Sequence, residues 1–261
     1  MITTTADPNN RRFAVLIDAD NIPRDCIKSV MEEVAIYGTP TIKRIYGDWT
    51  SPNIGGWKTS LLENAITPIQ QYGYTTGKNS TDSAMIIDAM DILYSGKTDG
   101  FVLVSSDSDF TRLAIRLREA GMKVIGIGEK KTPKPFVVAC DKFIYIEVIR
   151  QNAAEDKAPQ EPVGKSEKKP KAARQRTEKV PDDVVKFIAD SVASLSDVDN
   201  SVFMGELGNL IMKKQPDFDP RSFGFKSLSA LIKSIERFEV DFRQTTDPNI
   251  KHPYVSDKEA Q

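Results

Sequence analysis

Short apolar runs alternate with segments of helical periodicity over the first 150 residues of the chain. Short apolar runs predict buried strands, whereas apolar positions spaced three and four apart predict helices. The expected strands span 13–17, 41–46, 67–72, 101–105, 123–127 and 143–148. The expected helices span 22–37, 57–65, 75–95 and 111–120. This alternation predicts an α/β domain over 11–150, with a parallel sheet covered by helices on both faces.

Two acids of the segment 75–95 are placed by helix geometry. At 100° per residue, the apolar face contains Ile86, Ile87, Met90 and Leu93. Asp82 falls on the same side, one turn before Ile86, so its carboxylate is expected to point towards the sheet. Asp88 projects from the opposite face, where a solvated side chain is expected.

The composition changes after residue 150. Residues 151–180 are dominated by Ala, Pro, Gln, Glu and Lys, and between Gly164 and Val180 seven basic residues accompany two acidic ones. Such a segment cannot bury enough apolar surface to fold, so we expect a flexible basic linker. Its charge suits a phosphate backbone, and solubility explains it equally well. Residues 1–10 are polar and are expected to be disordered.

Helical spacing returns in the last third of the chain. The expected helices span 183–195, 201–213 and 222–238, and short extended segments follow at 239–243 and near Tyr254. Three helices and a small β wing predict a winged helix over 181–255, followed by a tail at 256–261. A winged helix binds either nucleic acid or protein, so the fold alone does not decide its role.

Composition narrows the classes of function. The chain has 261 residues, of which 39% are hydrophobic and 28% charged, and its net charge is −1. It shows no run long enough for a membrane span and no apolar core of a signal peptide, so a cytoplasmic location is expected. Cys26 and Cys140 stand alone and are expected to be buried thiols. The one histidine, His252, lies in a polar segment, which argues against Ser-His-Asp and zinc-histidine chemistry.

Acidic residues follow two of the predicted strands. Asp18 and Asp20 come directly after the first strand, and Asp107 and Asp109 come after the fourth. One acid near Ser106 would suffice to cap the next helix, but capping explains neither Asp18 nor the sheet side of Asp82. Carboxylates brought together repel one another, and a divalent cation relieves that repulsion. All-oxygen ligation favours Mg²⁺ or Mn²⁺, which promote phosphodiester hydrolysis.

Three segments together resemble the NYN domain, the ribonuclease-like branch of the PIN superfamily that includes the bacterial LabA-like proteins. They are VLIDADN, GKNSTDSAMIIDAMDIL and VLVSSDSDFTRLAIRLREAGMKVIGIG, and they span roughly residues 11–150. The resemblance implies that the catalytic and metal-binding acids are Asp18, Asp82, Asp107 and Asp109. It also implies supporting positions at Asn21, Asp88 and Ser106, and a basic position for substrate phosphate at Lys78. RNA contact near Arg44 and Trp49 is a further, less specific expectation.

The segment FMGELGNLIMKKQPDFDPRSFGFKSLSALIKSIERFEV resembles the OST-HTH or LOTUS domain, a winged helix linked to RNA binding. The most specific part is DFDPRSFGFKSLSALI. By this resemblance Arg221, Lys226 and Lys233 are expected to meet RNA.

Three hypotheses follow. The leading one is a metal-dependent ribonuclease that acts on single-stranded RNA and carries a tethered RNA-binding winged helix. The second is a non-catalytic RNA-binding adaptor whose acids hold a metal without turnover. The third is a haloacid-dehalogenase-type phosphatase, because Asp18-Ala-Asp20 resembles the DxD nucleophile motif of that family, although Asn21 stands where Thr or Val is usual.

Overall fold

The computed structural model describes residues 11–51, 56–72, 80–155, 180–196, 200–244 and 251–260. The predicted disordered start and most of the predicted linker therefore lie outside the described residues. The chain forms two compact units, Met1–Lys157 and Ala158–Gln261.

The N-terminal unit is built on a six-stranded sheet in which all neighbouring strands are parallel. In chain order the strands are β1 Arg12–Asp18, β2 Thr39–Gly47, β3 Thr67–Gln70, β4 Gly100–Val104, β5 Lys123–Gly128 and β6 Lys142–Tyr145. Their order across the sheet is β3-β2-β1-β4-β5-β6. The central strands β1 and β4 are buried along almost their whole length, as expected for a parallel sheet covered on both faces.

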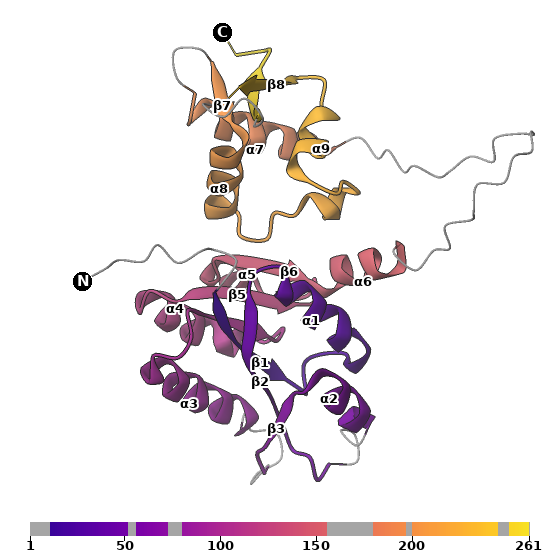
Figure 1. The fold of residues 1–261 in the computed structure, drawn as a ribbon, viewed down its shortest axis with the longest axis vertical. Coiled ribbons are helices and arrows are strands. Elements are labelled where there is room, and N and C mark those ends of the chain that lie inside the picture. The colour runs from indigo at the N-terminus through magenta and orange to yellow at the C-terminus, as the bar shows by residue number, and fades with distance from the viewer. Residues whose placement is uncertain are drawn as a thin grey trace, which may run out of the picture. The chain divides into compact units, whose positions relative to one another are not determined.

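Helices cover both faces of this sheet (Figure 1). One face packs against α1 Ile27–Ala35, α2 Lys58–Asn64 and α6 Ile146–Glu155. The other packs against α3 Ser80–Ser95, α4 Thr111–Glu119 and α5 Lys134–Ala139. Alternation along β1 feeds both cores, because Val15 belongs to the first and Leu16 to the second. The predicted α/β fold is confirmed.

Two details of the prediction for this unit were wrong. The apolar run expected as a strand over 143–148 divides at residue 145, where β6 ends and α6 begins. The short helix α5 was not predicted at all. Cys26 and Cys140 are buried free thiols, as expected, and burial raises the pKa of each to about 12.

The C-terminal unit combines helices with a three-stranded antiparallel sheet in the order β7-β9-β8. Its elements are α7 Asp182–Ala193, β7 Ser201–Phe203, α8 Met204–Lys214, α9 Leu228–Lys233, β8 Phe238–Gln244 and β9 Lys251–Asp257. In the segment predicted as a helix over 201–213, the first three residues form β7 and the helix α8 begins at Met204. In the segment predicted as a helix over 222–238, the α-helix is α9 alone. A separate core lies between the helices and the sheet, and it includes Ile188, Leu207, Leu231 and Val255.

A candidate metal centre

The candidate site lies where the strand order of the sheet reverses. From β1 the chain moves to β2 on one side, whereas from β4 it moves to β5 on the other. The helices that follow these two strands, α1 and α4, cover opposite faces. Such a reversal leaves a crevice at the carboxyl ends of the two central strands, where ligands of α/β proteins bind. Asp18 ends β1, and the loop after β4 carries Asp107 and Asp109.

Asp18 is buried, with 1% of its surface exposed. Its Oδ2 accepts hydrogen bonds from Asn21 Nδ2 and Ser105 Oγ, both at 2.7 Å. Its Oδ1 accepts from the Asp20 amide at 3.1 Å. Burial raises the pKa of Asp18, and these hydrogen bonds act in the opposite direction. Asn21 thus contacts Asp18 directly.

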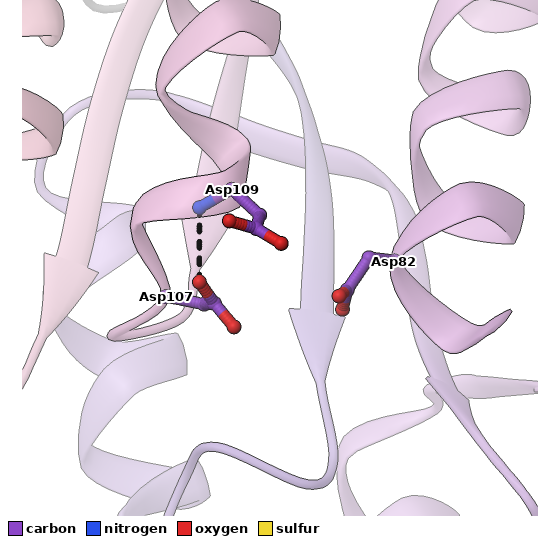
Figure 2. Close-up of side chains that lie close together, drawn as sticks. All are labelled: Asp82, Asp107 and Asp109. Atoms are coloured by element: carbon purple, nitrogen blue, oxygen red, sulfur yellow. Dashed lines mark hydrogen bonds between the residues drawn. The ribbon is translucent and has the colours of Figure 1, made fainter. Parts of the chain in front are cut away.

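Three other carboxylates meet beside this strand end. Asp82, Asp107 and Asp109 each place an oxygen within 4.8 Å of the other two. Figure 2 shows Asp82 extending from α3 towards the two acids of the loop after β4. Asp107 also caps the short 3-10 helix Ser108–Phe110, because its Oδ1 accepts from the Asp109 amide at 2.9 Å. Asp107 therefore caps this short helix and also belongs to the acid cluster.

The acids act on one another electrostatically. The pKa of Asp82 rises from 3.8 to about 6, first because of burial and then because of the negative charge of Asp18, Asp107, Asp109 and Asp20. Asp18 thus lies near the three-acid cluster without belonging to it. Its neighbour Asp20 is exposed and adds a further negative charge.

The donor set fits a hard divalent cation. All three side chains offer oxygen, which Mg²⁺ and Mn²⁺ prefer. Oxygens that surround Mg²⁺ at about 2.1 Å lie up to about 4.2 Å apart, so the 4.8 Å limit of the cluster requires only a small contraction. Positive charge there would also relieve the repulsion that raises the pKa of Asp82.

Sequence analysis missed Ser105, which is fully buried. Its hydroxyl donates to Asp18 and accepts from the Asp107 amide at 3.0 Å. The serine predicted as a supporting residue, Ser106, is turned elsewhere, since its Oγ accepts from the Glu129 amide at 2.9 Å. A serine at the end of an apolar run carries no motif, so only the tertiary contact identifies it.

The prediction that Asp88 projects into solvent was wrong. Its carboxylate accepts hydrogen bonds from Arg44 Nη1 and from the Tyr46 hydroxyl, both on β2. The side chain is 20% exposed and faces the sheet instead of solvent. The buried face of α3 contains Met85, Ala89 and Ile92. Ile87, assigned to the apolar face, is 64% exposed.

The residues predicted to contact RNA differ in their surroundings: the two arginines are paired with acids, whereas two of the lysines are exposed. Arg44 is engaged by Asp88, and Arg221 forms an ion pair of 2.7 Å with Asp219. Lys226 and Lys233 are exposed, and Lys233 lies 4.9 Å from the centre of the Phe242 ring. Lys78 lies outside the described residues. The indole of Trp49 donates to the Ile69 carbonyl and packs on the core, so it is not a free aromatic surface.

Comparison with known families agrees with this geometry. The model of the NYN domain matches residues 12–147, which include every acid of the site. The chain belongs to the NYN domain family. The NYN domain is followed by an OST-HTH/LOTUS domain at residues 175–250, the segment that contains most of the C-terminal unit. Both predicted resemblances are confirmed.

Solved structures add distant likenesses of parts of this chain. A protein of unknown function from Vibrio parahaemolyticus, known from a crystal structure, is 18% identical with a TM-score of 0.46; the match covers 54% of this chain and 96% of that one. A protein from Nitrosomonas europaea, solved by NMR, is 30% identical with a TM-score of 0.30 and covers 38% of this chain and 95% of its own. No curated protein matches the chain. Within the described residues, no helix has the length and apolar character needed to cross a membrane.

Proposed function

We propose that this NYN protein is a metal-dependent ribonuclease that hydrolyses phosphodiester bonds of single-stranded RNA. The observation that supports this most is the meeting of Asp82, Asp107 and Asp109 within 4.8 Å, near the carboxyl ends of β1 and β4. Three carboxylates at that spacing raise the free energy of the empty site. This arrangement therefore lowers the stability of the folded protein, but it favours the binding of a cation.

The roles of the residues follow from their contacts. Asp82, Asp107 and Asp109 would hold Mg²⁺ or Mn²⁺. When bound there, such an ion supplies Lewis-acid activation of water and neutralises charge on the scissile phosphate. Asp18 adds negative charge to the site, and Asn21 and Ser105 fix its orientation through hydrogen bonds of 2.7 Å. Asp107 is further fixed by its bond to the Asp109 amide.

The OST-HTH/LOTUS domain supplies a second nucleic-acid contact in this proposal. Lys226 and Lys233 remain candidates for phosphate contact because both are exposed. Arg221 is a weaker candidate, since its guanidinium is held by both oxygens of Asp219. The RNA would thus be bound by one domain and cleaved by the other.

The phosphatase hypothesis fits the geometry poorly. A nucleophilic aspartate needs an accessible oxygen, whereas Asp18 is 1% exposed and its Oδ2 already accepts two hydrogen bonds. The adaptor hypothesis uses the same metal site without turnover, so activity alone separates it from the ribonuclease.

The test is cleavage of labelled single-stranded RNA by the purified full chain in Mn²⁺, Mg²⁺ or EDTA. We expect cleavage that requires the metal and falls by about 100-fold or more in Asp107→Asn, since one oxygen ligand loses its charge. Asp91→Asn is the matched control, because Asp91 is an exposed aspartate on the same helix as Asp82 and lies outside the cluster.

Binding of the same RNA distinguishes the outcomes. Wild type and Asp107→Asn that bind RNA equally and are both inactive in all three conditions would support the adaptor instead. Equal cleavage by wild type and Asp107→Asn would show that the acid cluster is not the site of chemistry. An aspartyl-phosphate at Asp18, or a stable beryllofluoride adduct that mimics it, would point to the phosphatase.

A further inference from the structure

One face of the C-terminal sheet carries aromatic rings that its core does not use. Val202 and Val255 point into the core, so their neighbours along β7 and β9 lie on the opposite face. There the ring of Phe203 lies 5.0 Å from that of His252 and 5.8 Å from that of Tyr254, measured between centroids. All three residues are only half-buried. The single histidine of the chain is therefore part of an aromatic cluster.

An arginine completes this surface. Arg243 on β8 lies opposite His252 in the strand register, and its guanidinium carbon is 4.6 Å from the centre of the Tyr254 ring. The residue is exposed, and no salt bridge joins it to a carboxylate among the residues that the structure describes. A guanidinium that stacks on a ring offers its other plane to a further flat group.

The Phe203 ring is held against the backbone of the following helix. A Cβ added at Gly205, in the first turn of α8, would lie 2.6 Å from a ring atom of Phe203. Because Gly205 has no side chain, the Phe203 ring can pack against the first turn of α8. A ring fixed in this way loses little conformational entropy on binding, which favours a preformed contact surface.

The charged residues of the C-terminal unit decide from which side a polyanion would approach the aromatic face. A groove of about 890 Å³ at the other end of the sheet has a rim with more acids than bases. Its charged residues are Asp182, Asp190, Glu236 and Glu259 against Lys186 and Arg237. Arg237 is already paired with Asp257. On the aromatic face Arg243 lies near the end of β8, and alternation along that strand also places Asp241, opposite Tyr254, and Glu239 on this face. Phosphate groups would approach from the side of Arg243, because Asp241 and Glu239 lie further along the strand.

We propose that Phe203, His252, Tyr254 and Arg243 form a stacking platform for unpaired bases of single-stranded RNA. The inference deepens the proposed function, on which it rests for the class of ligand. Bases stack on aromatic rings and on guanidinium planes with little dependence on sequence. A platform of this kind would bind many RNAs and would leave the chemistry to the acid cluster of the other domain.

The test measures binding of fluorescent single-stranded RNA by anisotropy, with the full chain carrying Asp107→Asn so that RNA stays intact. We expect Tyr254→Leu to weaken binding about five- to 150-fold, the loss associated with one stacked base. Arg243→Lys keeps the charge and removes the planar group, so it should also weaken binding while the salt dependence stays the same. Tyr94→Leu is the matched control, because Tyr94 is an exposed aromatic residue on α3, outside the C-terminal unit.

An abasic oligonucleotide of equal length isolates the role of the bases. The parent should bind it about as weakly as Tyr254→Leu binds normal RNA, and Tyr254→Leu should cause no further loss. Arg243→Lys is an exposed substitution, so it tests the platform even if Tyr254→Leu perturbs folding. The platform is overturned if both variants bind normal RNA within twofold of the parent, or if Tyr94→Leu weakens binding as much as they do.

Failure of the two proposals can be told apart. If wild type binds RNA through these residues but never cleaves it, the nuclease proposal fails and the platform stands. If RNA is cleaved in a metal-dependent way while the platform variants bind and cleave normally, only the platform fails.

Discussion

Ser105 connects the acids of two different strands. Its hydroxyl donates to Asp18 at the end of β1 and accepts from the amide of Asp107 in the loop after β4. One small side chain therefore fixes both the orientation of a buried carboxylate and the backbone that presents a cluster acid. Groups that orient the acids around a metal affect activity nearly as much as the ligands do.

We expect Ser105→Ala to lower RNA cleavage about 10- to 100-fold, because Asp18 and the Asp107 amide lose their shared partner. Ser106→Ala is the control. Among the described residues the Ser106 hydroxyl accepts from the Glu129 amide and bonds none of the acids, so this variant should affect cleavage much less. Metal-dependent cleavage rates of both variants under identical conditions give the comparison. Equal losses in the two would mean that the bond to Asp18 has no special role.

Asp82 makes the free protein less stable at neutral pH. Its pKa is about 6 in the folded chain, compared with 3.8 for an ordinary aspartate. Since the folded value is the higher one, ionisation favours the unfolded chain. The loss of stability begins as the pH rises above about 4 and is complete above about 6.

In EDTA at about pH 7, Asp82→Asn should therefore raise the midpoint of thermal unfolding of the NYN domain by about 2–5 °C. Below about pH 4 the two proteins should unfold together, because Asp82 is then protonated. Added Mg²⁺ should stabilise wild type more than the variant. Circular dichroism melts at both pH values provide the measurement, and a variant less stable than wild type in EDTA at neutral pH would contradict it.

Helix α3 is anchored to the sheet through Asp88. That carboxylate bonds Arg44 and Tyr46 on β2, and Asp82 lies nearer the start of the same helix. These bonds thus fix the position of α3 along the direction of β2. They thereby also fix the position of Asp82 relative to the loop after β4.

We expect Asp88→Ala to raise the Mg²⁺ concentration needed for half-maximal cleavage by about tenfold, because one ligand of three is held less well. Asp91→Ala removes an exposed carboxylate of the same helix and should leave the metal dependence unchanged. A lower unfolding temperature with an unchanged metal requirement would show that the anchor only stabilises the fold.

Helix α3 also shows what the sequence can and cannot predict. Apolar residues occupy most of its circumference, so the helical wheel placed Asp82 correctly towards the sheet and yet chose Ile87 in place of Met85, Ala89 and Ile92. The segment from β6 to α6 is continuous in apolar residues, and periodicity cannot divide such a run between strand and helix. Ser105 escaped prediction because its partner Asp18 is 87 positions away. Patterns along the chain predicted the layers and the acids, whereas contacts across the chain had to be observed.

For the whole molecule, the division into two units and the basic residues between them predict where a protease cuts first. The chain divides near Lys157, and seven basic residues lie between Gly164 and Val180. Because trypsin cleaves after Lys and Arg, which are dense in this stretch between the two units, it should cut first there and leave one resistant fragment from each unit. Mass spectrometry of a time course identifies the cuts. Mg²⁺ should protect the N-terminal fragment alone, and simultaneous cuts inside both units would refute the linker prediction.

The pairing of β1 with β4 determines when, during synthesis, the sheet and the acid cluster can be completed. Ala14 pairs with Phe101, so the central strand of the sheet gains its second neighbour only after two further βα units have been made. Contacts this distant along the chain form slowly, because a long loop must close first. A nascent chain that ends before β4 lacks both the middle of the sheet and two of the three clustered acids. The proposed nuclease chemistry would therefore begin only after most of the NYN domain has left the ribosome.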